Sequence, residues 1–219
     1  MISTARLISV NVGEPRELLW MGRTVKTGIF KDAIRGRVAV RRLNLNGDKQ
    51  ADLSVHGGLD KAVYLYPAEH YVYWQEEYPG MQLPWGMFGE NLTTEGMLED
   101  EVSIGDQFRV GSVELMVTQP RLPCYKLGIR FGRDDIIKRF MAAGRPGFYL
   151  RVLQEGEVGA GDTIERISRD DGEVTVSDVF RLIGKDRDDT ETLRRAVQVK
   201  TLPDSLRSHF LNNLERQVR

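Results

Sequence analysis

The stretch FRVGSVELMVTQPRLPC, residues 108–124, does most to decide the fold. Its apolar side chains recur at every second position on both sides of Gly111 and Ser112, which is the pattern of two strands joined by a tight turn. Three further segments alternate in the same way, residues 5–12, 38–43 and 148–153. Because Gly, Asn and Asp separate such segments up to about residue 166, we predict a mainly β fold, a barrel or a sandwich.

Two helices interrupt this β pattern. The first is predicted to begin at Pro67, because proline suits the first position of a helix. The second is predicted to begin at Asp134 as its N-cap and to end at Gly144. The first helix places three aromatic side chains on one face, Tyr71, Trp74 and Tyr78. We assign such stripes to core packing and not to a cofactor site.

After about residue 168 the apolar period changes to that of helices. Three short helices are predicted, over residues 176–183, 190–199 and 203–217. Thr175 and Asp178 have the spacing of a capping box before the first of them. This segment carries ten basic and ten acidic residues, so no DNA-binding face is indicated. We expect an α+β protein with one domain over residues 1–167 and a second over 168–219.

The overall charge excludes several classes of partner. The 219 residues include 31 Lys or Arg and 32 Asp or Glu, so the chain as a whole would not gather nucleic acid or anionic lipid. No run approaches the roughly 20 apolar residues of a membrane-spanning helix, and the first 15 residues lack the apolar stretch of a signal peptide. We expect a cytoplasmic monomer or homodimer without nucleic-acid or membrane partners.

Cys124 is the main candidate for chemistry, because the familiar catalytic signatures are missing. The chain contains no G-x-S-x-G, no Walker A lysine loop, no G-x-G-x-x-G and no C-x-x-C. A structural zinc site needs about four ligands, whereas this chain has one cysteine and three widely separated histidines. A lone cysteine is usually an inert small hydrophobe, so the setting of Cys124 decides its assignment.

That setting favours a functional thiol. Pro120 and Pro123 favour an extended loop at the end of a strand, where binding sites commonly lie. From residue 121 to residue 151, eight Lys or Arg stand against two acids. Positive neighbours favour the thiolate and attract an anionic ligand such as a phosphate. A soft thiolate also suits a thiophilic metal that brings its other ligands with it.

Two polar clusters bounded by glycines are further candidates. In VHGGLDKAVYLY, residues 55–66, the paired glycines let backbone N–H groups approach a ligand, and His56, Asp60 and Lys61 offer polar groups. FGENLTTEG, residues 88–96, places polar side chains between glycines. Taken alone, each cluster is more readily a turn than a site.

Together with Cys124, these segments resemble the YiiM-like branch of the MOSC-domain family. The likeness rests on four motifs in order, H-G-G-x-D-K-A-V, P-A-E-H-Y-x-Y-W, F-G-E-N-L-T-T-E-G and Q-P-R-x-P-C-Y-K-L, and covers residues 35–167. The helices after residue 168 resemble the small helical domain of this branch. The resemblance implies a MOSC-type β-barrel with a few helices, followed by a C-terminal three-helix domain.

The resemblance also implies an activity. Members of this branch hold a molybdenum cofactor of the molybdopterin type through a cysteine that matches Cys124, and reduce N-hydroxylated compounds such as hydroxylaminopurines. The matched proton donors are His56, Asp60 and Glu90, among which the sequence does not choose. The matched cofactor contacts are Gly57, Gly58, Lys61, Asn91, Thr93, Arg121 and Lys126. A separate reductase must supply electrons, because the chain shows no flavin or iron–sulfur signature.

Three alternatives stay open at this point. Cys124 could carry a persulfide in a sulfur-transfer or cofactor-binding module without redox catalysis. Pyridoxal phosphate chemistry has been linked with such domains, although the lysines here lie in no Schiff-base context. The chain could also be a purely structural or interaction protein, with Cys124 in its core and partners recruited by the terminal helices.

Overall fold

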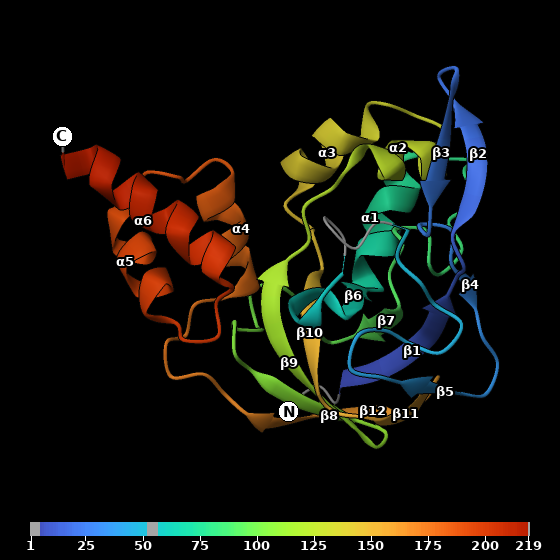
Figure 1. The fold of residues 1–219 in the computed structure, drawn as a ribbon, viewed down its shortest axis with the longest axis horizontal. Helices are drawn as coiled ribbons and strands as arrows, with labels where there is room; N and C mark the ends of the chain where they lie inside the picture. The colour runs from blue at the N-terminus through green and yellow to red at the C-terminus, as the bar shows by residue number, and fades with distance from the viewer. Residues whose placement is uncertain (1–4, 52–56, 219) are drawn as a thin grey trace.

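The computed structural model describes residues 5–51 and 57–218, and its centre is a closed β-barrel (Figure 1). Seven strands follow one another around the ring in the order β12-β8-β9-β10-β6-β7-β1, and β1 pairs back onto β12. Only the β6–β7 pair is parallel within this ring. The strands are β1 (Ala5–Val12), β6 (Val63–Pro67), β7 (Leu92–Glu95), β8 (Gln107–Val110), β9 (Val113–Pro120), β10 (Phe148–Gln154) and β12 (Thr163–Ser168). The predicted mainly β fold is confirmed as a barrel.

The β8–β9 hairpin forms as its sequence predicts. Val110 pairs with Val113 across the turn. Gly111 has φ 57°, and a Cβ placed there would lie 2.4 Å from the carbonyl oxygen of Glu157, so the position requires glycine. The alternating side chains of both strands point into the barrel and are buried, namely Phe108, Val110, Val113, Leu115 and Val117.

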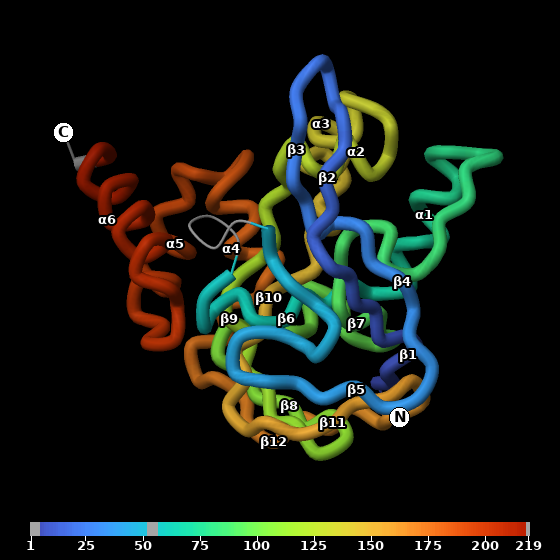
Figure 2. The backbone as a smooth tube through the Cα atoms, turned by 45° about the vertical axis from the view of Figure 1, so that its right-hand side comes forward, coloured from blue at the N-terminus to red at the C-terminus, as the bar shows by residue number. Residues whose placement is uncertain are grey.

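Smaller sheets lie outside the ring of the barrel. β4 (Asp32–Ala33) extends the main sheet beyond β1, and β5 (Arg37–Val40) pairs with β11 (Gly156–Gly159). β2 (Arg16–Trp20) and β3 (Arg23–Thr27) pair only with each other among the described strands. Their hairpin stands outside the barrel beside helices α2 and α3 in both views (Figures 1 and 2).

The helices that interrupt the barrel begin later than predicted. α1 spans Glu69–Glu77, so Pro67 does not open it but ends β6. A proline is accommodated there because β10 pairs with β6 only over Val63–Leu65, so Pro67 lies beyond that pairing in the position of an edge residue. α3 spans Ile136–Ala143 after Asp135, and Asp134 is therefore not the N-cap; Gly144 ends the helix with φ 66°, as predicted.

The aromatic stripe of α1 is confirmed as core. Its side chains pack in a second apolar cluster with residues of β6, α2 (Tyr125–Phe131) and α3. The Tyr66 and Phe88 rings stack with centroids 4.4 Å apart, and the indole nitrogen of Trp74 donates to the Tyr66 hydroxyl at 2.7 Å. α2, which begins directly after Cys124, packs against this cluster.

The three predicted terminal helices are present as α4 (Val176–Ile183), α5 (Thr190–Gln198) and α6 (Asp204–Val218). The capping box is confirmed, because Asp178 N–H donates to Thr175 Oγ1 and Thr175 N–H donates to the Asp178 carboxylate. Val176, Val179 and Leu182 of α4 belong to the same apolar cluster as the barrel interior. The division of the chain at residue 168 stays a prediction.

Among the described residues, no helix has both the length and the apolar character that crossing a membrane requires.

Candidate functional site

Cys124 lies where the β9 strand gives way to a helix. β9 ends at Pro120, residues 121–124 form neither helix nor strand, and Cys124 itself is extended, with φ −123° and ψ 169°, at the N-cap position of α2. The predicted loop at a strand end is thus confirmed for residues 121–124. The helix was missed, although Gly132, which ends it in the left-handed conformation, is a recognisable stop signal.

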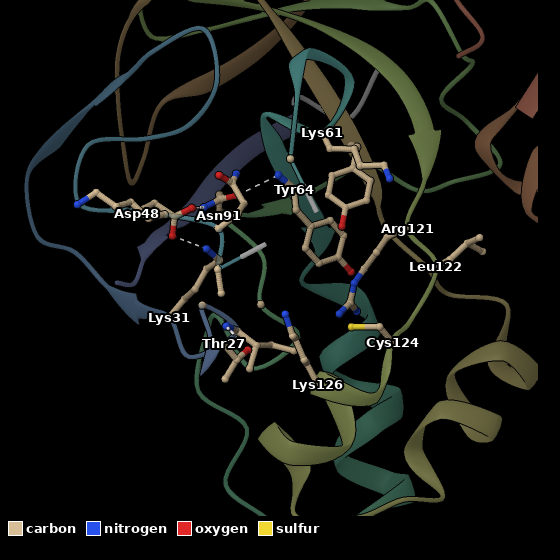
Figure 3. A pocket seen from close by; sticks show the side chains of 18 residues that line it. Thr27, Lys31, Asp48, Lys61, Tyr64, Asn91, Arg121, Leu122, Cys124 and Lys126 are labelled. Atoms are coloured by element: carbon tan, nitrogen blue, oxygen red, sulfur yellow. Dashed lines mark hydrogen bonds and ion pairs between the residues drawn. The ribbon is translucent and has the colours of Figure 1, made fainter. Parts of the chain in front are cut away.

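A pocket of about 680 Å³, including its open mouth, surrounds the half-buried Cys124. Its walls come from residues 27–31, 48–51, 57–64, 89–91 and 121–126, with Tyr149 from β10. Segments distant in sequence therefore meet at one sulfur atom. Figure 3 shows the Cys124 sulfur beside the Arg121 side chain, with Lys126 rising next to it and Asp48, Asn91 and Lys31 on the far side. A concave site in which several polar groups converge on a thiol is the usual setting for a bound small molecule or cofactor.

The pocket is strongly cationic in a nearly neutral protein. One carboxylate, that of Asp48, lines it among the described residues. The described lining also carries five cations, Lys31, Lys49, Lys61, Arg121 and Lys126. Since the whole chain has a formal net charge of −1, the folding concentrates positive charge at this position. Such a concave cationic surface favours an anionic ligand.

Arg121 is the most informative side chain of the pocket. It is 5% exposed, and its guanidinium lies 4.9 Å from the Tyr64 ring centroid and 5.3 Å from that of Phe140. Its Nη1 is fully buried and has no hydrogen-bond partner among the described residues. Burying a charged donor without an acceptor is costly, so this nitrogen indicates an acceptor that a ligand supplies.

Lys126 and Lys61 add two ammonium groups. Lys126 is 9% exposed at the second position of α2, and within residues 5–51 and 57–218 its ammonium forms no ion pair. Lys61 lies at the end of η1 (Leu59–Lys61), the short 3₁₀ turn before β6. Both side chains line the pocket that holds Cys124. The structure thus brings together Cys124, Lys61, Arg121 and Lys126, as the matched motifs predict.

A buried polar network forms the opposite wall. Asp48 accepts from the Lys31 ammonium, from the Asn91 amide at 2.9 Å and from Gly13 N–H at 3.0 Å. The Asn91 carbonyl oxygen accepts from Tyr64 N–H at 3.1 Å. Asn91 was predicted, whereas Lys31 and Asp48 were missed because they belong to no recognisable motif and meet Asn91 only in three dimensions.

Two tyrosines that the sequence did not indicate complete the lining. The Tyr64 and Tyr149 rings lie with centroids 5.3 Å apart, and Tyr64 donates its hydroxyl to Pro146 O at 2.8 Å. Burial raises the pKa of both phenols, so both hydroxyls keep their protons at neutral pH. Their positions on β6 and β10 follow from strand alternation, but alternation alone does not show which face borders a pocket.

The remaining predicted residues lie apart from the described lining, except Gly57, which borders the pocket. Asp60 is held by Arg151, whose Nε donates to its carboxylate at 2.8 Å. Gly58 begins η1 with φ 86°. His56 lies outside the described residues.

Glu90 and Thr93 belong to a buried hydrogen-bond network behind the pocket wall. The Glu90 carboxylate is 0% exposed and accepts from Gly86 N–H at 2.8 Å, Phe88 N–H at 3.1 Å, the Thr93 hydroxyl at 2.9 Å and the Tyr71 hydroxyl. These bonds fix the turn that carries Gly89 and Asn91 to the pocket. The geometry gives Glu90 a supporting position behind the site.

The donor set fits a metal that arrives with other ligands attached. Across the described residues, no three His, Cys, Asp or Glu side chains cluster as metal ligands. The pocket offers one thiol, an unsatisfied guanidinium nitrogen and several ammonium groups. A soft metal in an anionic organic ligand satisfies both kinds of group, because the thiolate binds the metal and the cations bind the anion.

Comparison with known families matches both parts of the chain. Residues 52–165 match the MOSC domain family, and residues 174–217 match the YiiM-like 3-alpha helix domain family.

Known proteins are similar over much or all of the chain. The uncharacterized protein YflK of Bacillus subtilis (strain 168) is 40% identical over 210 residues, 96% of this chain and 95% of YflK. Protein YiiM of Escherichia coli (strain K12) is 41% identical over 145 residues, 65% of each chain. A protein named "Reductase" from Gibberella moniliformis is 37% identical over 166 residues, which are 74% of this chain but only 29% of that protein.

Solved structures show the same arrangement of strands and helices. The crystal structure of YiiM from Geobacillus stearothermophilus superposes with a TM-score of 0.80 and 33% identity, covering 96% of this chain and 99% of that one. YiiM from Escherichia coli gives a TM-score of 0.77 and 28% identity, covering 97% and 94%.

Proposed function

This chain belongs to the MOSC-domain family and carries its YiiM-like helical domain, and on that premise we propose that it binds a molybdenum cofactor through Cys124 and reduces N-hydroxylated compounds. The observation that carries the proposal is the buried, unsatisfied Nη1 of Arg121 beside a thiol in a cationic pocket. An ordinary core cysteine would need no such neighbours.

Each group of the pocket has a part in holding the cofactor. Cys124 would ligate the metal as its thiolate. Arg121, Lys61 and Lys126 would bind the phosphate, because charged donors pair best with anionic oxygens. The Gly57 backbone and the second lone pair of Asn91 Oδ1 would hold the pterin, because the amide N–H groups of Asn91 already donate to Asp48 and to Asn11 O. When bound, the cofactor supplies the two-electron redox couple that no side chain here provides.

The proposed reaction breaks one N–O bond. The substrate R–NH–OH takes up two electrons and two protons and gives R–NH₂ and water. Of the donors matched by motif, Asp60 is engaged by Arg151 and Glu90 is fully buried behind the wall. We therefore assign proton donation to the Tyr149 phenol, which lines the pocket and whose pKa burial raises, or to His56, the remaining motif-matched donor, which lies outside the described residues.

Apolar side chains at the pocket favour a planar substrate. The Tyr149 ring is half-buried in the wall, and Leu122 is 44% exposed. Both offer surface to a flat heteroaromatic ring such as that of a hydroxylaminopurine. Similarity to the protein named "Reductase" supports a redox role, although the match covers only 29% of its length.

Metal analysis of the purified protein tests the proposal. Protein made in a host that synthesises the cofactor is expected to contain about one molybdenum per chain. Cys124→Ser should abolish the metal content, whereas Leu122→Ala, in the same loop, should retain it. The loaded wild-type protein should convert a hydroxylaminopurine to the aminopurine with a chemical reductant, and Cys124→Ser should not.

Two results would contradict the proposal. If wild-type protein from such a host contained no metal, the protein would not be a cofactor-binding protein. A stable gain of one sulfur atom on Cys124 in that metal-free protein, seen by mass spectrometry, would instead support a persulfide carrier, for which the same cations would stabilise the anionic sulfur.

A further inference from the structure

The β2–β3 hairpin is attached to the site at its base and projects away from it. Its register runs from Arg16 opposite Thr27 to Trp20 opposite Arg23, and no described barrel strand pairs with it. Thr27, where β3 ends, lines the Cys124 pocket. Figures 1 and 2 both show the hairpin standing beside α2 and α3. The base of this hairpin, but not its tip, therefore borders the pocket wall.

The tip of the hairpin displays apolar side chains to solvent. Leu19 is 73% exposed and Met21 is 72% exposed. Met21 has φ 48° and Gly22 has φ 75°, so both turn residues are left-handed. Asn or Asp is the usual first residue of such a turn, and a bulky residue there is an outlier. A strained and exposed methionine is better explained by contact with a partner than by the stability of the turn.

A groove separates the hairpin from the two helices. It encloses about 1300 Å³ with its open side, and apolar side chains line both of its walls, Trp20, Met21 and Val25 on the hairpin and Tyr125 and Ile137 on the helices. Tyr125 directly follows Cys124 in the chain and is 56% exposed. The groove therefore borders the proposed redox site through a single residue.

The charge of this face is opposite to that of the molecule. Residues 16–27 and 130–143 together carry seven Lys or Arg and three Asp or Glu, whereas the chain has a formal net charge of −1. Glu77 of α1 pairs with Arg139, and the charged residues that line the groove itself are Arg23 and Asp134, so the excess of positive charge lies on the rim of this face. A second copy would present the same positive face, and the two would repel. An acidic partner matches the charge, and the apolar tip and groove would be the centre of its contact.

We propose that this face, formed by the β2–β3 hairpin and helices α2 and α3, is the docking surface for an acidic one-electron carrier protein that reduces the site at Cys124. The inference rests on the proposed function, whose reaction consumes two electrons that the chain does not hold. Two carriers are each oxidised by one electron, and with two protons those electrons convert the N–O bond into an amine and water. Docking here places the carrier against Tyr125, one residue from the metal ligand.

The test compares two reductants under anaerobic turnover of a hydroxylaminopurine. One is reduced plant-type ferredoxin, an acidic one-electron carrier, and the other is methyl viologen reduced by dithionite, which needs no docking surface. Leu19→Ser with Met21→Ser should lower kcat/KM for ferredoxin roughly tenfold and leave the viologen rate unchanged. Arg23→Glu should do the same and should weaken the dependence of the ferredoxin rate on salt.

Matched controls lie on other faces. Val72→Ser changes an apolar side chain that is 65% exposed on α1, and Arg194→Glu reverses an exposed charge on α5. Neither should alter the ferredoxin rate.

The possible outcomes are distinguishable. Viologen turnover with no ferredoxin turnover, or equal ferredoxin rates for wild type and hairpin variants, would overturn the docking surface and leave the proposed function standing. No turnover with either reductant would count against the proposed function itself. A wild-type dimer that the double serine variant converts to a monomer, measured by light scattering, would assign the face to a second copy and overturn the inference.

Discussion

Arg121 shows at the scale of one residue how a site can be recognised without its ligand. Its guanidinium is packed between aromatic rings in a buried position, and one of its nitrogens lacks an acceptor among the described residues. The same residue was predicted from its place beside Cys124, but its burial and its missing partner are visible only in the structure.

Replacing Arg121 should therefore separate stability from binding. Arg121→Met removes a buried charge whose Nη1 has no acceptor among the described residues, and it keeps most of the side-chain volume and its packing against the rings, so the metal-free protein should keep its melting temperature. Molybdenum content should fall at least about tenfold, because a charged hydrogen bond to an anion is lost. Arg121→Lys should retain more metal. A large fall in melting temperature with unchanged metal content would show a purely structural role for Arg121.

Glu90 supports the wall of the pocket and should affect stability in a pH-dependent way. Glu90→Gln places an amide N–H against a backbone N–H that now donates to the carboxylate, which should cost about 1–3 kcal/mol of unfolding free energy. Burial raises the pKa of Glu90 above its ordinary 4.5, despite hydrogen bonds that oppose the shift. Protonation therefore favours the folded state.

The sign of the pH effect follows from that direction. The contribution of Glu90 to stability is complete below its unfolded pKa and is lost as pH rises through the raised folded value. The stability difference between wild type and Glu90→Gln should accordingly shrink as pH increases from 4 to 7, as measured by denaturant unfolding. A difference that grows over this range would show that the hydrogen bonds to the ionised carboxylate outweigh its burial.

At the scale of elements, the apolar periodicity located the strands and the terminal helices. The helix starts predicted from Pro67 and Asp134 were each one or two residues too early. Pro67 suits either a strand end or a helix start, and pairing of β6 with its neighbours decides between them. α2 was missed because seven residues are too few for a clear helical period and two prolines precede it. Packing against the aromatic cluster stabilises α2, and the local sequence does not reveal such long-range packing.

The capping box of α4 is an element-level feature that the sequence did predict, and it can be tested directly. Thr175→Ala removes an acceptor that satisfies the Asp178 N–H at 3.0 Å, so it should lower the free energy of unfolding by about 1 kcal/mol. Thr175→Ser keeps the hydroxyl and should lie close to wild type in the same denaturant titration. Equal stability of the alanine variant would mean that packing of α4 on the barrel suffices.

At the scale of the whole molecule, folding gathers cations from separate segments around one sulfur, while the net charge stays near zero. The metal-free protein should therefore bind small polyanions at this pocket. Inorganic pyrophosphate should slow alkylation of Cys124 by iodoacetamide. The protection should weaken at an ionic strength of about 0.5 M, because salt screens the attraction.

Lys126→Met provides the matched variant for this measurement. It removes one cation from the pocket and leaves the thiol in place, so it should reduce the protection by pyrophosphate. Alkylation rates that do not respond to pyrophosphate in wild-type protein would contradict a cationic binding pocket at Cys124.

The sequence by itself determined the mainly β class and the helical C-terminal part, and its resemblance to a known family indicated the barrel and the grouping of Cys124 with Lys61, Asn91, Arg121 and Lys126. It could do so because apolar periodicity reports burial and because motifs are contiguous in the chain. Tertiary structure alone decided which polar residues reach the pocket. It placed Asp60 on Arg151 and Glu90 behind the wall, and it added Lys31, Asp48 and Tyr149. The direction in which a side chain points depends on strand pairing and loop packing between segments far apart in the chain, and local sequence carries no record of these contacts.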